Sequence, residues 1–479
     1  MKTIANLITL GGLLAALGMA QSRHYKITDL GTLPGGNFSQ ATFIDNKGVI
    51  TGLASLADGT QHAVIWRDGK ILDIAKPGLG GLNSAAFASN EKGQILVQAE
   101  ASSKDPKNEN FCAYGTGLAC LPALWENGTT TPLATLGGNN GTVGTMNSRG
   151  EAAGIAETAI VDRACPAGVA VNGTGPQVLG FQAVIWGPKL GDIRVLKPLP
   201  GDIVGMAIAV NDSGQAVGAS GSCANTLLPP IAVGPHAVLW DKDGTPKDLG
   251  NLGGTVDVTQ LAIGHMALSI NNQGDVVGAS AVTGNEAGHA FLWTREKGMK
   301  DLGTLHGDGA SFASCINDRN DVVGTSFGEN GPRAYLWRNG VMTDFNTLIP
   351  QDSPLYLQFA SAINSKGDVI GSGVTSTGET HAFLATQAPT AASAGPKNTT
   401  AISRQITLDG TASFSADGAP LTYSWSIPQG SPSAAILHGN TATPEVQFSW
   451  RGLYTFQLMV TDSTGASATD IATVNFQGN

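Results

Sequence analysis

Charged side chains are scarce in this chain. Asp, Glu, Lys and Arg make up 13% of its 479 residues, about half the share of an ordinary globular protein. The formal net charge is −10 at pH 7, and no run of Lys and Arg is present that would neutralise phosphate groups. We therefore expect no nucleic-acid partner.

Long apolar runs are missing as well. The one candidate, residues 4–17, is too short to cross a bilayer, and nothing later in the chain is long enough. Because Lys2 precedes this run and small residues around Ala20 follow it, we interpret residues 1–20 as a signal peptide. No cysteine follows the expected cleavage point, which argues against a lipid anchor. The sequence predicts a protein without a membrane span that is secreted, extracellular or periplasmic.

Recognisable catalytic motifs are also absent. The chain has no Ser-His-Asp spacing, no His-Glu-x-x-His, no Gly-Lys-Ser phosphate loop and no Cys-x-x-Cys. We therefore expect no catalytic residue, no metal site and no cofactor, and we favour a protein that is not an enzyme.

Glycine, by contrast, is abundant, with 64 residues, and one short motif recurs through the chain. The motif reads HAFLW at residues 289–293. Six variants stand at residues 62–66, 122–125, 182–186, 236–240, 333–337 and 381–385. Seven copies at variable spacing are typical of a supersecondary unit repeated with loops of different lengths.

Each repeat contains four apolar or β-branched segments bounded by Gly, Asn, Asp or Pro. In residues 301–337 they read DLGTL, ASCIND, DVVGTS and RAYLW, and the same order recurs in the other repeats. Segments of this length and composition predict β-strands. The Asn-Asp-x-Gly and Trp-x-x-Gly sequences between them predict tight hairpins, so we expect antiparallel strands.

The HAFLW strand predicts how the sheets pack. Side chains alternate along a strand, so His289, Phe291 and Trp293 point to one face while Ala290 and Leu292 point to the other. Both faces are apolar. Each sheet is therefore expected to lie between two other sheets, as a blade does in a propeller.

The repeated histidine, at positions 62, 236, 289 and 381, has two interpretations. It is either a packed residue that bonds locally or a metal ligand or catalytic group. Because Gln182 and Arg333 replace it in two repeats without any pattern, we favour the packed residue.

The two ends of the repeat region complement each other. The first repeat opens with YKITDLGTL at residues 25–33 without a preceding HAFLW strand, and the last ends with HAFLAT at residues 381–386 without a following partner. Pairing these strands would close a ring and remove exposed sheet edges. We predict an all-β fold, with a seven-bladed β-propeller over residues 25–386. The sequence leaves open which strand of each blade is innermost.

Three long insertions fall in neighbouring repeats, at residues 102–121, 157–181 and 221–235. Antiparallel strand order places all three at the end opposite the tight turns. We interpret them as a binding rim, since function concentrates on loops held by a rigid scaffold. The alternative is drift in loops that tolerate change.

Four of the five cysteines lie in these insertions. Cys112 and Cys120 share one loop and are predicted to form a disulfide in an oxidising compartment. Cys165 and Cys223 lie in the corresponding loops of the next two repeats and could pair with each other. Cys315 lies within a predicted strand and is expected to be a buried free thiol.

The long-loop end also carries candidate ligand-binding residues, namely Asp202, Asp257, His265, His306, Asp308 and Asp352. Paired carboxylates there would suit glycosidic acid–base chemistry. Scattered surface acids are more common than catalytic pairs, however. We therefore favour binding and keep a carbohydrate-active enzyme as the alternative.

The composition changes after Thr386. Residues 387–398 are rich in Pro, Ala and Ser, which is typical of a linker. Residues 399–479 alternate apolar and polar side chains between turn residues. This pattern predicts an immunoglobulin-like β-sandwich with Trp425 in its core.

The segments LDGTAS, ADGAPLTYSW and YTFQLMVTDSTGASATD cover nearly all of residues 399–479 and resemble the polycystic-kidney-disease (PKD) family of immunoglobulin-like domains. The resemblance implies a spacer or adhesion module of a secreted protein, with calcium in some members. Here Asp417 remains, but Ala419 stands where an Asp is common, so calcium is only weakly indicated.

The repeat region resembles the HAF family of extracellular repeat proteins through HAFLW, DLGTL and the IND-G-VVG pattern. The resemblance covers residues 25–386, implies bacterial secretion and names no ligand. We therefore predict a secreted or cell-surface binding or adhesion protein whose long-loop end binds an extracellular polysaccharide or surface protein. A carbohydrate-active enzyme and a purely structural surface spacer are the alternatives.

Overall fold

The computed structural model describes residues 25–76, 78–165, 177–224, 226, 234–255, 264–284, 287–387, 389–415, 420–462 and 465–478. The predicted signal peptide, Asp257, Asp417 and Ala419 lie outside these residues. Two compact units divide the described chain, one spanning Tyr25–Thr386 and the other Gln387 onwards. Apart from one short 3-10 helix, η1 (Phe345–Leu348), the elements of the described chain are β-strands. The predicted all-β class is confirmed.

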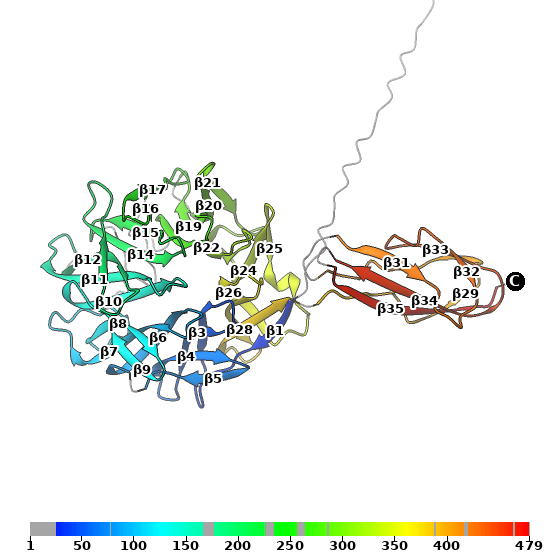
Figure 1. The fold of residues 1–479 in the computed structure, drawn as a ribbon, viewed down its shortest axis with the longest axis horizontal. Helices are drawn as coiled ribbons and strands as arrows, with labels where there is room; N and C mark the ends of the chain where they lie inside the picture. Colours follow the sequence, from blue (N-terminus) through cyan, green and yellow to red (C-terminus); the bar gives the residue numbers. More distant parts are fainter. Residues whose placement is uncertain are drawn as a thin grey trace, which may run out of the picture. The chain divides into compact units, whose positions relative to one another are not determined.

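Seven four-stranded sheets make up the first unit (Figure 1). Sheet 1 contains β2 (Ser39–Ile44), β3 (Ile50–Ser55), β4 (Gln61–Arg67) and β5 (Lys70–Asp73). Sheet 2 contains β6 (Gly80–Ser89), β7 (Ile95–Lys104), β8 (Leu118–Glu126) and β9 (Thr129–Pro132). Sheet 3 contains β10 (Gly137–Met146), β11 (Ala152–Val161), β12 (Leu179–Trp186) and β13 (Ile193–Leu196). Sheet 4 contains β14 (Val204–Val210), β15 (Ala216–Gly221), β16 (His236–Trp240) and β17 (Pro246–Asp248). Sheet 5 contains β18 (Met266–Ile270), β19 (Val276–Ala281), β20 (Gly288–Thr294) and β21 (Gly298–Gly303). Sheet 6 contains β22 (Ala310–Ile316), β23 (Val322–Gly328), β24 (Gly331–Arg338) and β25 (Val341–Asp344). Sheet 7 contains β26 (Leu355–Ile363), β27 (Val369–Thr375), β28 (Thr380–Gln387) and β1 (Tyr25–Asp29).

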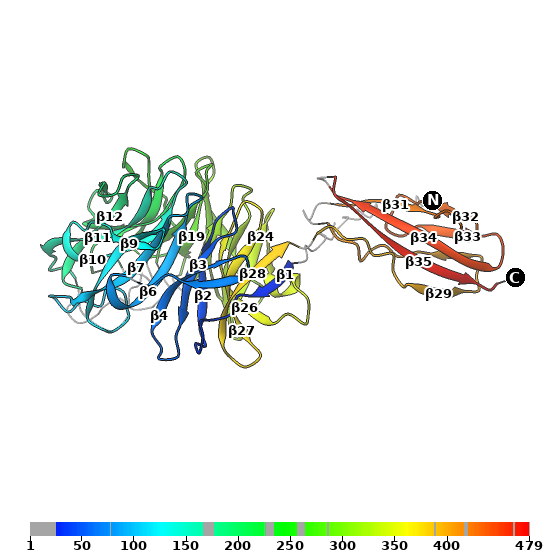
Figure 2. The same cartoon turned by 60° about the horizontal axis from the view of Figure 1, so that its bottom comes forward.

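Each sheet joins three strands of one repeat to the first strand of the next repeat. In sheet 6, for example, β22, β23 and β24 pair as antiparallel neighbours, and β25 is the opening strand of the following repeat. The last sheet has no following repeat, and β1 from the start of the chain takes the vacant place beside β28 (Figure 2). The predicted antiparallel hairpins are confirmed, and so is the predicted pairing of the first and last strands of the repeat region.

The HAFLW strand β20 is buried on both faces, as its composition predicts. Phe291 and Trp293 pack in one cluster with Leu239 of sheet 4, while Ala290 and Leu292 pack in another with Tyr335 of sheet 6. One sheet therefore contributes to two hydrophobic cores. The stability of each sheet depends on both of its neighbours.

The succession of sheets returns to its start. Ile370 and Ala382 of sheet 7 share a cluster with Val64 and Trp66 of sheet 1. In Figure 1 the sheets follow one another in chain order from blue to yellow until the last lies beside the first. Each of the seven sheets therefore packs against a neighbouring sheet on both of its faces.

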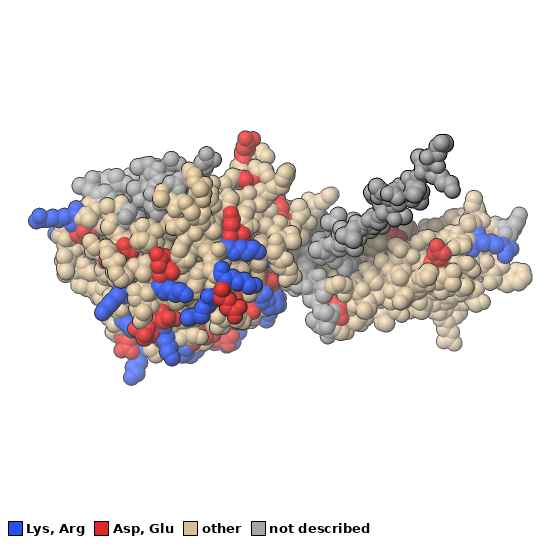
Figure 3. Space-filling view, turned by 90° about the horizontal axis from the view of Figure 1, so that it is seen from above, with Lys and Arg blue, Asp and Glu red and all other residues tan. Residues whose placement is uncertain are grey.

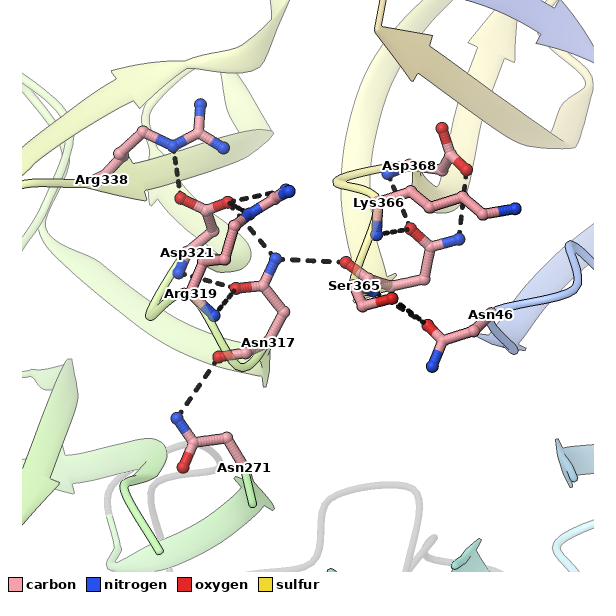
Figure 4. Close-up of polar contacts among 10 residues, drawn as sticks. Asn46, Asn271, Asn317, Arg319, Asp321, Arg338, Ser365, Lys366 and Asp368 are labelled. Carbon is pink, nitrogen blue, oxygen red and sulfur yellow. Dashed lines mark hydrogen bonds and ion pairs between the residues drawn. The ribbon is translucent and has the colours of Figure 1, made fainter. Parts of the chain in front are cut away.

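A second set of contacts joins the sheets through the turns that follow β2, β6, β10, β14, β18, β22 and β26, here called the Asn turns. In five of them the first residue donates a side-chain Nδ2–H to the backbone carbonyl of the equivalent residue in the next turn. The links run from Asn147 to Asn211, Asn271, Asn317, Asn364 and finally Asp45, at 3.0, 3.0, 3.3, 3.1 and 3.4 Å. Figure 4 shows the donations made by Asn271 and Asn317.

Asparagine suits this position because its carboxamide has an acceptor and a donor. In Asn317, Oδ1 accepts from the backbone N–H of Arg319 and Asp321 within its own turn, while Nδ2 reaches Asn364. Asp45 keeps the acceptor contacts, to Lys47 at 2.9 Å, but has no Nδ2 donor. This position therefore donates nothing to sheet 2; instead, Asp45 Oδ2 accepts a hydrogen bond from Ser89 Oγ of β6 at 3.4 Å.

We expect Asp45→Asn to stabilise the first unit by up to about 1 kcal/mol, because the new Nδ2–H can donate to the carbonyl of Asn90, a gain partly offset by the loss of the long acceptor contact with Ser89 Oγ. The reverse change, Asn317→Asp, should cost about 1–3 kcal/mol, because the carbonyl of Asn364 loses its donor. Urea unfolding of both variants measures the two effects. A destabilised Asp45→Asn variant would contradict the role assigned to the donor.

The second unit is a two-sheet β-structure. One sheet contains β29 (Asn398–Ala401), β35 (Ser467–Phe476), β34 (Gly452–Thr461) and β31 (Thr422–Ser426), and the other β30 (Gln405–Thr407), β33 (Glu445–Phe448) and β32 (Ala434–Leu437). Trp425 lies in the shared core with Phe456 and Leu458, as predicted. Two positions of the predicted linker also contact this unit, since Ala391 bonds Phe414 through the backbone and Ala394 is buried.

Candidate functional site

The hairpin connections give the first unit two different ends. The Asn turns and the turns after each HAFLW strand lie together at one, the tight-turn end, because antiparallel strands return to the side from which they came. The three insertions and the connections that lead into β6, β10, β14, β18, β22 and β26 lie at the other, the long-loop end.

At the tight-turn end the Asn turns and the strands before them line a single cavity of about 300 Å³, to which all seven sheets contribute. Polar side chains such as Thr42, Ser269 and Ser361 line it. Charged side chains gather on one side of this unit in Figure 3, and Lys47, Lys92 and other cations of the Asn turns donate to backbone carbonyls of neighbouring turns. The polar groups at this end are largely engaged in joining sheets.

The repeated histidines bond locally, as predicted. His62, His289 and His381 each place Nδ1 2.7–2.9 Å from an Asp of the neighbouring strand, namely Asp73, Asp301 and Asp29. Three of the four histidines thus tie adjacent strands of one sheet together.

The long-loop end is built from the three insertions. Cys112 and Cys120 form a disulfide within the first, with a Cα–Cα distance of 5.8 Å, as predicted. Cys165 and Cys223 form a second disulfide, Cα–Cα 4.7 Å, which joins the insertions of sheets 3 and 4. Cys315 is unpaired, as expected; the residue as a whole is half-buried, and burial raises the pKa of its thiol.

The insertions share one hydrophobic core, here called the insertion cluster. Its buried members are Phe111, Cys120, Ile155, Cys165, Phe181, Val204, Met206, Ala219, Cys223 and Met266. They come from sheets 2, 3, 4 and 5, so the insertions cover the starts of β14 and β18. The first insertion also contributes to the packing of the unit, because Phe111 and Glu109 are buried in it. The interpretation of the three insertions as a binding rim stays a prediction.

A network of buried carboxyl groups joins the first insertion to the second. Glu109 Oε1 accepts hydrogen bonds from the backbone N–H of Val178 at 2.6 Å and Leu179 at 2.8 Å. Gln177 Nε2 donates to both Glu109 Oε1 and Glu157 Oε1, at 3.2 and 2.9 Å. Glu157 Oε2 accepts from Asn140 through its backbone N–H at 2.9 Å and its side chain at 3.0 Å.

Burial governs the ionisation of these groups. Burial, and next the neighbouring Glu109 carboxyl, raise the pKa of Glu157 to about 8. Burial likewise raises the pKa of Glu109, and the backbone donors at Leu179 and Val178 oppose that rise. No Lys, Arg or His of the described chain forms an ion pair with either carboxyl group.

Two of the predicted ligand-binding residues lie where sheets 4 and 5 meet. Asp202 Oδ2 lies 2.9 Å from His236 Nδ1 and also accepts a hydrogen bond from Ser220. His265 is buried, with Nδ1 3.0 Å from Ser280 Oγ, and burial lowers its pKa, followed by the influence of His236. These side chains already have protein partners.

Two others lie on sheet 6, around Arg333. Its Nη2 donates to Asp308 Oδ1 at 2.7 Å and to the backbone carbonyl of His306 at 3.1 Å, while Nη1 donates to Asp344 at 3.0 Å. Asp352 is exposed in the turn before β26, and Asp257 lies outside the described residues. The structure thus distributes the predicted residues over several sheets instead of gathering them.

Exposed apolar side chains mark the long-loop end, and the sequence reading missed them. They are Leu82, Ile160, Val161, Ile203, Phe327 and Tyr356, from five of the seven sheets. Ile160 and Ile203 are 72% and 57% exposed and lie on neighbouring sheets beside the insertions. Phe327 also contacts Phe312 and Phe359, with ring centroids 5.6 and 6.4 Å apart.

A metal-like cluster occurs among the described residues only at Asp162, Cys165 and Cys223, and its two cysteines form a disulfide. Disulfide sulfurs do not act as thiolate ligands, so these residues do not fit a metal ion. Among the described residues, no helix is long and apolar enough to span a membrane.

A family model described as a PKD domain matches residues 394–476. The C-terminal unit is a PKD-like domain. The solved PKD domain of the KIAA 1837 protein is 26% identical over 19% of this chain and 90% of its own, with a TM-score of 0.17. The HAF resemblance of residues 25–386 stays a prediction, and no curated protein matches the chain.

Two solved structures similar to a larger share of the chain are bacterial. Virginiamycin B lyase from Staphylococcus aureus is 11% identical, covers 75% of this chain and 99% of its own, and has a TM-score of 0.42. The extracellular domain of the one component system BT4673 from B. thetaiotaomicron is 8% identical, with 96% of this chain and 60% of that chain covered and a TM-score of 0.40.

Proposed function

We propose that residues 25–386 form a seven-bladed β-propeller, closed by β1, that binds an extracellular polysaccharide or surface protein through its long-loop end. The PKD-like domain would then serve as a spacer or adhesion module. Two disulfides suit an oxidising compartment, and PKD-like domains belong to secreted proteins by the resemblance stated above. The HAF resemblance adds a bacterial origin to the proposal.

The contrast between the two ends carries this proposal. Polar groups of the tight-turn end bond to neighbouring turns, and Leu190 and Val341 are the large apolar side chains exposed at its described turns. The long-loop end presents six exposed apolar side chains around insertions braced by a disulfide. Exposed apolar side chains gathered on one surface are a sign of an interaction site. The spread of Asp202 and Asp308 over separate sheets favours binding over glycosidic cleavage, which needs a carboxyl pair about 5–9.5 Å apart.

Replacing Ile160 and Ile203 with Asp should weaken binding by at least about tenfold, because two desolvated apolar contacts are worth more than about 1.4 kcal/mol. The purified protein is screened on a glycan array and against cell-surface proteins, and the variant is then measured on each hit. Leu190→Asp is the matched control, since Leu190 is 63% exposed but lies in the turn after β12, at the tight-turn end.

Equal losses in both variants would contradict a binding site at the long-loop end, and the absence of any hit would favour the spacer alternative. A second variant, Phe327→Ala with Tyr356→Ala, separates the two ligand classes. Aromatic faces pack against sugar rings, so a polysaccharide ligand predicts a loss of binding in this variant. Because Phe327 also contacts Phe312 and Phe359, a small drop in melting temperature is expected, and binding is compared at a temperature where both proteins are folded.

A further inference from the structure

The first insertion is held to the second by a pair of carboxyl groups that cannot both be charged. Glu109 and Glu157 are each fully buried, and one group, Gln177 Nε2, lies within hydrogen-bond distance of both, 3.2 Å from Glu109 Oε1 and 2.9 Å from Glu157 Oε1. Two carboxylates have acceptors only, so they cannot bond each other unless one holds a proton. Like charges held close together in a dry site also repel strongly, and neither carboxyl has a cation beside it among the described residues.

The contacts of Glu109 indicate which oxygen shares the proton with Glu157. Glu109 Oε1 is saturated by the N–H groups of Val178, Leu179 and Gln177, whereas Glu109 Oε2 is buried without any donor. A buried oxygen without a partner costs about 1–3 kcal/mol. A shared proton between Oε2 and Glu157 removes that cost, and no other group of the described insertions is in place to do so.

A metal ion does not fit this place. Both oxygens of Glu157 accept N–H groups, from Asn140 on one side and Gln177 on the other. Asp105, the nearest further carboxylate, accepts from Asn140 Nδ2 at 2.8 Å. Donors of this kind cover the lone pairs that a cation would need.

We propose that Glu109 and Glu157 form a protonated latch that keeps the insertion cluster closed, and that the first insertion detaches from the second when the shared proton is lost to solvent at alkaline pH. The proposal concerns how the covered starts of β14 and β18 become accessible, and it does not rest on the proposed ligand. Release would expose Phe111, Met206 and Met266, which are buried in the insertion cluster. Asp105 is the other charged group that acts on both carboxyls, and its charge favours release as well.

The direction of the pH effect follows from which state holds the proton. The closed state raises the pKa of Glu157 to about 8, whereas in the opened insertion Glu157 returns to its ordinary value of 4.5. Between these values the closed state binds one proton more than the open state. Closure is therefore strongest in acid, and the ratio of closed to open molecules falls about tenfold per pH unit through this window. Above about pH 8 the fall levels off.

The test compares the wild-type protein with Glu109→Gln in the full chain. The introduced carboxamide would keep an acceptor for Val178 and Leu179 and would supply its own N–H to Glu157, so the latch no longer needs a proton. Binding of the dye ANS, which reports exposed apolar surface, is followed from about pH 5 to about pH 9.5. The wild-type signal should rise with pH, whereas that of Glu109→Gln should stay low throughout.

Two further variants complete the test. Glu109→Ala removes the latch and should bind the dye at every pH, and Glu329→Gln, an exposed acid on sheet 6, should keep the wild-type profile. A flat profile in the wild-type protein, or an equal rise in Glu109→Gln, would overturn the proposal. Glu157→Gln offers a second route to the same answer, because its new N–H faces Glu109.

Discussion

Trp240→Ala should be among the most destabilising single substitutions in the first unit, at about 3–5 kcal/mol for the emptied site. Trp240 is fully buried on sheet 4 and packs against Ala183, Ile185 and Leu196 of sheet 3. Its indole Nε1–H also donates to the backbone carbonyl of Lys197 at 2.6 Å. Loss of that donor leaves a carbonyl unpaired and adds about 1–3 kcal/mol.

Two variants separate the contributions. Trp240→Phe keeps most of the apolar contact and removes the donor, so it should cost about 1–3 kcal/mol. Trp125→Ala is the matched comparison within the same unit, because Trp125 occupies the same motif position on sheet 2 but is only partly buried. Thermal and urea unfolding of the three variants gives the ranking. Equal losses for Trp125 and Trp240 would show that packing between sheets is not what the motif residue provides.

The motif to which Trp240 belongs shows how much of this fold can be predicted from the sequence. Alternation in HAFLW, with an aromatic on one face and a small residue on the other, was enough to predict a strand buried on both sides, and β20 divides its side chains between two cores in that way. Turn residues at fixed positions then predicted the hairpins. Both predictions succeeded because they depend on local backbone geometry, and the same strand and turn residues recur in each repeat.

Contacts between repeats were not open to the same reasoning. Asn317 reads locally as a turn residue, and its turn contacts alone would explain it. Its donation to Asn364 depends on which strand of each sheet faces the cavity, which the sequence leaves open. The regular recurrence of Asn at this position was the signal available, since a turn alone would accept Asp, as Asp45 demonstrates.

The candidate site was predicted less well, for a physical reason. Asp308 and Asp202 were chosen as acidic residues in long-loop connections, but Arg333 and His236, which pair with them, come from distant strands. Gln177, which donates to both Glu109 and Glu157, likewise links two repeats. Sequence spacing reports chemistry within a segment, whereas the ionisation and accessibility of these groups depend on the segments packed over them.

Removal of the first 29 residues should have the second large effect, because it takes β1 out of sheet 7. Tyr25 is buried, with its ring centroid 4.7 Å from that of Phe345, and its loss alone should cost about 3–5 kcal/mol. The contact between Asp29 and His381, at 2.9 Å, disappears as well. β28 would become an unpaired edge, and exposed edges promote association between molecules.

The truncated protein should therefore melt at a lower temperature and elute as larger species in gel filtration. A synthetic peptide of residues 25–33, added in trans, should restore the melting temperature, because it can occupy the place beside β28. A peptide of the same composition in scrambled order is the control. Restoration requires that β1 is held by β28 and the core around Tyr25 rather than by its covalent connection to β2. Should the truncated protein prove as stable as the intact one, sheet 7 would be complete without the N-terminal strand, and the closure of the seven sheets by β1 would be wrong.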